Sequence, residues 1–147
     1  MKPDDTLLLD NQLCFALYAT TRAVMQAYEP LLSKLGVTYP QYLALLVLWQ
    51  EDGATMKELG ERLFLDSGTL TPLLKRMEDA GLVTRNRSTK DERVVEVWLT
   101  LAGKRLKKQA FGVPAAMFCK SGMSPSEYLR LRNELRTIFE RLRRSAA

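Results

Sequence analysis

The pattern of apolar and polar positions predicts two long helices in the first third of the chain. From residue 10 to residue 35 apolar side chains recur at the i, i+3, i+4, i+7 spacing of an amphipathic helix, and Gly36 follows. Thr38, Pro40 and Gln41 form a helix start signal. The next stretch, "YLALLVLW", is apolar nearly all round, which predicts a central, buried helix.

Residues 55–99 hold a helix-turn-helix followed directly by a hairpin. The first helix opens on a capping box from Thr55 to Glu58, and the second, "GTLTPLLKRMEDA", ends before Gly81. Pro72 removes one backbone donor from the second helix, so we expect its first turns to be bent or weakened. "LVTRNR" and "RVVEVWL" are strand-like and are joined by the polar tip "STKDE". Together these elements predict a winged helix.

Two further helices are predicted after the hairpin. One runs from Thr100 to about Lys120, with a kink at Pro114, and the last opens at "SPSE". The near-heptad spacing of apolar residues in the last helix is typical of a helix–helix seam. Its members are Tyr128, Leu131, Leu135, Ile138 and Leu142.

The fold class is therefore mainly α with a small β-hairpin wing. We expect residues 1–147 to form a single domain, with a winged helix-turn-helix at about 38–100. The outer helices, at about 8–36 and 101–145, have no place within that small core. An N- and C-terminal homodimerisation module explains them best.

Composition limits the class of protein and its compartment. The chain is 46% hydrophobic and 27% charged, which is typical of a soluble globular protein. It has no apolar run of membrane-spanning length and no signal-peptide pattern at its start, so we expect a cytoplasmic protein without a membrane partner. In that compartment Cys14 and Cys119 are expected to be reduced or redox-active rather than permanently bonded.

The helix from residue 68 to residue 80 and the hairpin carry the candidate nucleic-acid contacts. Small polar side chains gather at the start of the helix, where they can approach base edges, and helix N-termini present N–H groups to phosphates. The net charge of +5 favours an anionic partner. Alternatively, the polar residues only cap the helix and the basic ones are solvated. The candidates are Asp66, Ser67, Thr69, Thr71, Lys75, Arg76, Arg85, Arg87, Lys90 and Arg93.

Cys14 has two possible roles, as a small apolar side chain in a core or as a reactive thiol. The chain contains no histidine, so a thiolate there needs tyrosine hydroxyls or a helix N-terminus for stabilisation. Tyr18, one turn away, is a candidate neighbour. Two cysteines without histidine make a poor metal-ligand set, and we expect no metal or cofactor.

Four stretches of the sequence resemble a known family. "NQLCFALY", "VTYPQYLALLVLW", "GERLFLDSGTLTPLLKRMEDAGLV" and "KDERVVEVWLT" resemble the organic hydroperoxide resistance regulators of the MarR family, closely over residues 8–101. The resemblance implies a homodimeric winged-helix repressor. Such a repressor leaves its DNA when an organic hydroperoxide oxidises a cysteine, and its symmetry implies a near-palindromic operator.

Matched residue by residue, the resemblance assigns roles both to the residues of a thiol site and to the candidate DNA contacts. Cys14 matches the sensing cysteine, and Tyr28 and Tyr39 match tyrosines that hydrogen-bond its thiolate; the alternative is that they are core aromatics. Cys14 and Tyr28 are 14 residues apart, about 21 Å along one helix, so Tyr28 would have to come from the other subunit. Cys119 matches a resolving cysteine that forms an intersubunit disulfide with Cys14, unless it is a spectator thiol.

The resemblance also places Asp66, Ser67, Thr69 and Thr71 on the recognition helix of the family, the helix that reads the DNA bases. In the wing, Arg93 matches an arginine that enters the minor groove, and Asp91 matches the acid that braces it.

Two rival functions differ in what the cysteines do. In the first, a MarR-type repressor is released by a small aromatic ligand in the dimer cleft and the cysteines are passive. In the second, the chain is a thiol peroxidase. The lack of histidine and of a C-x-x-C motif argues against the peroxidase, so we expect a protein that is not an enzyme.

Overall fold

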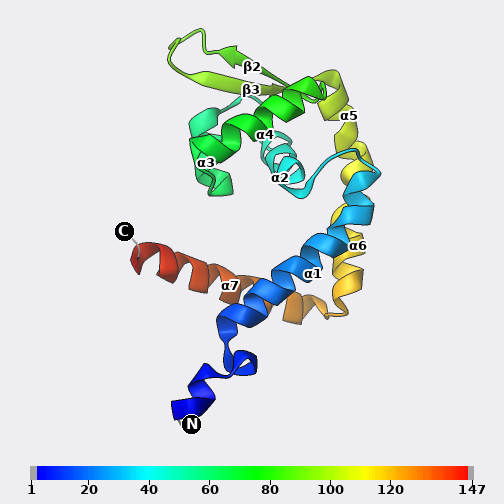
Figure 1. The fold of residues 1–147 in the computed structure, drawn as a ribbon. Coiled ribbons are helices and arrows are strands. Elements are labelled where there is room, and N and C mark those ends of the chain that lie inside the picture. The colour runs from blue at the N-terminus through cyan, green and yellow to red at the C-terminus, as the bar shows by residue number, and fades with distance from the viewer. Residues whose placement is uncertain (1–2, 146–147) are drawn as a thin grey trace. The chain divides into compact units, whose positions relative to one another are not determined.

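The computed structural model describes residues 3–145 of the chain (Figure 1). These residues form two compact units, which are described in turn, one up to Phe111 and the other from Gly112 onward. No helix among the described residues combines the length and the apolar character that a membrane crossing requires.

The first unit begins with two short 3₁₀ turns and a long helix. The expected helix from residue 10 begins only at Leu13, because the side-chain amides of Asn11 and Gln12 donate to upstream backbone carbonyls and favour turns. The long helix continues through Pro30. The turns are η1 (Pro3–Leu7) and η2 (Leu9–Asn11), and the helices of this unit are α1 (Leu13–Ser33), α2 (Tyr39–Leu48), α3 (Met56–Leu63), α4 (Ser67–Asp79) and α5 (Leu101–Ala110).

Side-chain caps fix the starts of α2 and α3, as predicted. Gln41 Oε1 accepts the backbone N–H of Thr38 at 2.9 Å. Glu58 Oε2 accepts that of Thr55 at 2.7 Å, and Thr55 Oγ1 accepts the N–H of Glu58 at 3.2 Å. The backbone N–H of Thr55 and its hydroxyl, which donates to Glu58 Oε2 at 2.8 Å, lower the pKa of Glu58 below its ordinary value. Each cap satisfies helix N–H groups that would otherwise need water.

Helix α4 passes through Pro72 without ending. Pro72 lies in its second turn, so only the carbonyl of Gly68 lacks its usual i+4 donor. The expected weakening therefore does not interrupt the helix. It ends at Asp79, and the chain turns at Gly81, whose φ of 69° is in the left-handed region.

A three-stranded antiparallel sheet forms the wing and its base. The predicted hairpin is present as β2 (Val83–Arg87) and β3 (Val95–Leu99). A third strand, β1 (Ala54–Thr55), pairs with the other side of β3, which gives the order β1-β3-β2. Two residues are too few to show strand alternation, so the sequence could not reveal β1.

The core of the first unit surrounds α2, as its apolar sequence predicts. Apolar side chains of α3, α4 and the sheet pack against it. In α3, Leu59 is buried, whereas Leu63, one turn later, is only half-buried. The buried residues include Tyr42, Ala44, Leu45, Val47, Leu48, Leu59, Leu70, Leu73, Leu74, Met77, Val83 and Val97.

Helix α5 is fastened to the winged helix rather than standing apart from it. The indole N–H of Trp49 donates to Gly103 O at 3.0 Å. Asp52 accepts the N–H of Leu99 at 2.8 Å and forms an ion pair with Lys104 at 3.0 Å. The compact unit therefore extends to Phe111, beyond the expected limit of the winged helix near residue 100.

The expectation of one kinked helix from residue 100 to residue 120 is wrong. The structure has two helices, because α5 ends at Ala110 and α6 (Gly112–Ser121) begins after Phe111. Pro114 lies in the first turn of α6, where its missing N–H breaks no helical hydrogen bond. Proline here favours a new helix start rather than a kink.

The second unit contains α6 and α7 (Pro125–Ser145). The last helix opens at "SPSE", as predicted, and its start is capped, because Glu127 Oε2 accepts from Ser124 N at 2.8 Å and from Ser124 Oγ at 2.6 Å. No residue of α7 is buried. Within the described unit its predicted seam therefore lies on the surface, with only Ile138 half-buried.

Candidate nucleic-acid interface and thiol sites

The start of α4 presents a polar face to solvent. Ser67, Thr69 and Thr71 are exposed, while the apolar side chains of the same helix face the core. Asp66 acts as the N-cap, because its Oδ1 accepts the N–H of Thr69 at 2.8 Å. The capping alternative therefore holds for Asp66, and the three hydroxyl side chains project from the first two turns. Lys75, further along the helix, is also exposed.

The basic residues of α4 lie beyond these hydroxyls. Lys75 Nζ is 3.8 Å from Asp79 Oδ2, a loose pair at i,i+4 between two well-exposed side chains. Arg76 is exposed as well. Pairs of this kind between solvated side chains contribute little stability, so both cations remain available to an anionic partner.

The tip of the wing carries an extended arginine. The side chain of Arg93 is 93% exposed, and its Nε lies 3.5 Å from Asp91 Oδ1. The same carboxylate oxygen accepts the backbone N–H of Arg93 at 3.0 Å. Asp91 thus contacts both the backbone N–H and the Nε of Arg93 within one turn. Arg87 and Lys90 are exposed nearby.

Arg85 has a different environment from the other basic residues. Its Nε and Nη2 donate to Glu78 Oε2 at 3.0 and 2.7 Å, and its backbone N–H donates to Oε1 at 3.1 Å. Hydrogen bonds from Arg85 lower the pKa of Glu78 below its ordinary value. Sequence analysis did not single out Glu78, because nothing in the local pattern distinguishes it from a solvated acid.

Cys14 is the second residue of α1 and is exposed. Its surroundings on the helix are also open, because Leu13 is 61% and Tyr18 is 56% exposed. The alternative that Cys14 fills the core of its own chain is therefore not supported. Its place in the first turn agrees with the sequence and lies at the positive end of the helix dipole.

Tyr28 and Tyr39 lie together at the junction of α1 and α2. Their ring centroids are 4.8 Å apart. They line a pocket of about 420 Å³ together with Met25, Leu32 and Val37. Burial, and to a lesser extent Tyr39, raise the pKa of the adjacent Tyr42.

Tyr18 interacts with Arg22, one turn further along α1. Arg22 Nη1 donates to the Tyr18 hydroxyl oxygen at 2.9 Å, and Arg22 Cζ lies 5.6 Å from the ring centroid. Since that oxygen accepts from Arg22, the hydroxyl proton is left to donate elsewhere. Cys14 is four residues before Tyr18 on the same helix. Arg22 is an additional residue of this region, and its i+4 spacing from Tyr18 is the sequence signal for the contact.

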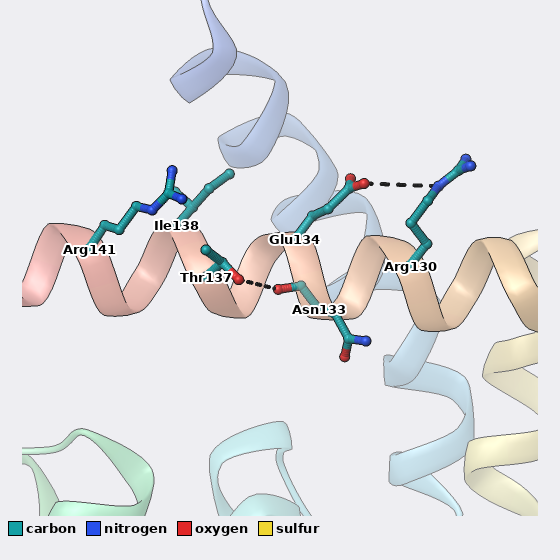
Figure 2. Close-up of a pocket in the computed structure, with 6 residues that line it drawn as sticks. All are labelled: Arg130, Asn133, Glu134, Thr137, Ile138 and Arg141. Carbon is teal, nitrogen blue, oxygen red and sulfur yellow. Dashed lines mark hydrogen bonds and ion pairs between the residues drawn. The ribbon is translucent and has the colours of Figure 1, made fainter.

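Cys119 lies near the end of α6, in the second unit, and is exposed. A shallow hollow in the same unit follows one face of α7, with Arg130, Glu134 and Arg141 among its lining residues (Figure 2). Arg130 Nε and Glu134 Oε1 form a loose pair at 3.9 Å there. All lining residues belong to a single helix, so this hollow is an open surface.

No group of three or more potential metal ligands occurs among the residues that the structure describes.

Comparison with known proteins identifies the family. Residues 26–110 match the family model described as transcriptional regulator SarA/Rot. The chain is 51% identical over 138 residues, 94% of each protein, to the organic hydroperoxide resistance transcriptional regulator of Bacillus subtilis (strain 168). It is 49% identical to the HTH-type transcriptional regulator TtmR of Methylorubrum extorquens (strain PA1), over 95% of this chain and 71% of TtmR.

Among solved structures, reduced AbfR bound to DNA is similar over 97% of this chain and 99% of AbfR, with a TM-score of 0.77 and 38% identity. These relatives are regulators, which confirms the expected fold class and the expectation that the chain is not an enzyme. The chain belongs to the MarR/SarA family of winged-helix transcriptional regulators, within its organic hydroperoxide resistance branch.

Proposed function

We propose that this chain is a DNA-binding repressor that acts as a homodimer and leaves its operator when an organic hydroperoxide oxidises Cys14. The observation that carries the redox part is the place of Cys14, exposed in the first turn of α1 and far along that helix from the tyrosine pair. The similarity to a hydroperoxide resistance regulator supports the nature of the oxidant.

The DNA contacts are assigned to two exposed elements of the first unit. Ser67, Thr69 and Thr71 at the start of α4 are suited to base edges, with Lys75 and Arg76 for phosphates. Arg93, held by Asp91, is suited to the minor groove. The structures of AbfR bound to DNA support this assignment. A symmetric dimer would read a near-palindromic operator in double-stranded DNA.

Two features support the homodimer. The first half of α1 and the apolar positions of α7 are exposed in the described chain, which leaves large apolar side chains in water. Within one chain Cys14 is also about 21 Å along α1 from Tyr28, so the two cannot meet. Two α1 helices that cross would bring Cys14 to Tyr28 and Tyr39 of the partner subunit.

The proposed reaction consumes one hydroperoxide for each Cys14–Cys119 disulfide. The Cys14 thiolate attacks the terminal peroxide oxygen, so that an S–O bond forms, the O–O bond breaks, and the alcohol leaves after taking up a proton. Tyrosine hydroxyls and the N-terminus of α1 stabilise the thiolate. The resulting sulfenic acid condenses with the thiol of Cys119 of the partner subunit, which forms a disulfide and releases water. A solved structure of disulfide-formed AbfR supports this last step.

Disulfide formation requires the two cysteines to approach closely. Their Cα atoms must come within about 7 Å. Cys119 lies in the second compact unit, whereas α5 is held to the winged helix through Trp49 and Asp52. We therefore place the movement at the Phe111–Gly112 boundary. The movement alters the spacing of the two winged helices and releases the operator.

The test is non-reducing electrophoresis, with DNA binding measured on the same samples before and after a stoichiometric organic hydroperoxide. Wild type runs beside Cys14→Ser and Cys119→Ser. A covalent dimer that needs both cysteines and no longer binds DNA is the expected result. DNA release that needs Cys14 without a covalent dimer would remove Cys119 from the mechanism, and unchanged release in Cys14→Ser would overturn the redox proposal.

The pocket beside Tyr28 and Tyr39 favours one second candidate. Its volume of about 420 Å³ suits a small aromatic molecule, so a repressor released by such a ligand, with passive cysteines, is the alternative. Release of the Cys14→Ser variant from DNA by an aromatic carboxylate such as salicylate would select this alternative.

A further inference from the structure

The carboxylate of Glu78 joins α4, the proposed recognition helix, to the wing. Glu78 lies in the last turn of α4, and Arg85 lies in the middle of β2. The carboxylate accepts three hydrogen bonds from Arg85, two from the guanidinium at 3.0 and 2.7 Å and one from the backbone N–H at 3.1 Å. The side chains of Glu78 and Arg85 are 34% and 25% exposed. Among the ion pairs of the described residues, no other cation is less exposed than Arg85, and only one acid, Asp52 at 26%, is less exposed than Glu78.

The position of Glu78 is unfavourable for an isolated helix. An acid in the last turn faces the negative end of the helix dipole, which disfavours the charged form. The pKa of Glu78 is nevertheless lowered, first by the side-chain hydrogen bond from Arg85 and then by the backbone one. The hydrogen bonds from β2 thus favour the charged carboxylate at this end of the helix, and one of them covers an N–H on the outer edge of the sheet.

This contact spans the two elements assigned to DNA. From Arg85, β2 leads to the wing tip, where Asp91 holds Arg93. The turn between α4 and β2 is itself hydrogen-bonded, because the Thr100 hydroxyl donates to Gly81 O and Leu82 O, and the Glu78 carboxylate adds a second connection beyond this turn. We propose that Glu78 and Arg85 are a positioning pair that sets the wing, and with it Arg93, relative to the recognition helix, and that Arg85 does not bind phosphate. This inference rests on the proposed DNA-binding function.

The Glu78→Gln variant distinguishes a positioning role of Arg85 from a phosphate-binding role, because the two roles predict opposite changes in DNA affinity. Glu78→Gln removes a negative charge close to DNA and frees Arg85, so electrostatics alone predicts tighter binding. Loss of the positioning pair predicts weaker binding, by about tenfold, because charge-assisted hydrogen bonds are lost. Arg85→Lys keeps the charge but lacks the planar fork, and it should weaken binding in the same direction.

A matched control and a second background complete the experiment. Glu92→Gln removes the same charge from the exposed wing tip and should bind DNA as tightly as wild type or more tightly. In an Arg93→Ala background, Glu78→Gln should change affinity by less than about twofold, because its effect acts through the wing. Thermal melts of each variant show whether the fold is kept.

Affinity is measured by fluorescence anisotropy with a labelled duplex from the chain's own promoter region. Glu78→Gln binding that is equal to or tighter than that of Glu92→Gln would overturn the inference and leave the DNA-binding function intact. Equal weakening in both backgrounds would overturn it as well, because that result indicates a general loss of structure. If wild type does not bind, the proposed function itself fails, and the inference fails with it.

Discussion

The rings of Tyr28 and Tyr39 lie 4.8 Å apart, centroid to centroid, at the junction of α1 and α2. Cys14 is on the same helix as Tyr28 but about 21 Å away along its axis. Tyr28 and Tyr39 form one half of the proposed thiol site, and the first turn of α1 carries the other half. The two halves meet only if each comes from a different copy of the chain.

Tyr28→Phe and Tyr39→Phe should each slow the oxidation of Cys14 by an organic hydroperoxide by about tenfold or more, because a hydrogen bond to a charged sulfur is lost. DNA binding by the reduced protein should be unchanged. Loss of free thiol after addition of cumene hydroperoxide measures the rate. Tyr128→Phe, on α7, is the control and should react at the wild-type rate.

Mixed dimers test whether the site is shared between subunits. A dimer of one Tyr28→Phe subunit and one Cys14→Ser subunit contains one complete site if Cys14 meets Tyr28 of the partner subunit. Its single Cys14 should then react at the wild-type rate. If both residues acted within one chain, that cysteine would face the substituted ring and react slowly. Differently tagged subunits, co-expressed and purified through both tags, provide the sample.

Arg93→Ala should weaken operator binding and lower the slope of affinity against salt by about one unit, because one positive charge in the minor groove, close to the phosphates on both sides, is removed. Asp91→Asn should also weaken binding, although it removes a negative charge, since the brace on Arg93 is lost. Titration at several salt concentrations measures both effects. Lys34→Ala, at the end of α1, should leave the slope unchanged.

Gly103→Ala should destabilise the fold by about 1–3 kcal/mol, because a Cβ there would lie 2.2 Å from Leu82 O and must displace backbone. Gly112→Ala is the matched control. A Cβ at Gly112 meets nothing within 4 Å, and alanine is the better helix former, so stability should be kept or slightly raised. Urea unfolding of the two variants gives the comparison.

Stability should fall in acid, in part through the caps of α3 and α7. The pKa values of Glu58 and Glu127 are lowered from the ordinary 4.5 by hydrogen bonds to Thr55 and Ser124. A carboxyl with a lowered folded-state pKa stabilises the fold above its unfolded value, and this contribution is lost as the pH falls through the folded value. Glu58→Gln should therefore lose less stability than wild type between pH 6 and about pH 3. Urea unfolding at both pH values checks this.

The sequence predicted those helices and strands whose pattern of residues is contained in the element itself and extends over several positions. The capping boxes at Thr38 and Thr55, the apolar α2 and the strand-like segments of the wing each carry enough residues to show a pattern. Strand β1 has two residues and depends on β3 for its existence. The break at Phe111 carries no signal as strong as the proline three residues later, so the sequence predicts a kink at Pro114 where the structure has a helix boundary at Phe111.

The sequence predicted candidate site residues correctly only in one respect, the exposure of polar side chains that contact no distant residue. The recognition-helix hydroxyls and Arg93 lie on the surface, as their polarity indicates. Arg85 looked the same in sequence, because a cation that forms an ion pair with an acid seven residues away cannot be told from a solvated one. Only the turn at Gly81, which folds β2 back along α4, brings Glu78 to it.

The separation of Cys14 from Tyr28 on one helix has a consequence for the cell. If the halves of the sensor belong to different copies, an unassembled copy has a cysteine without its activating tyrosines and tolerates hydroperoxide. Sensitivity to the oxidant then arises only at concentrations at which two copies meet, the same concentrations at which a symmetric operator can be read. Newly synthesised chains would be spared oxidation until they have a promoter to control.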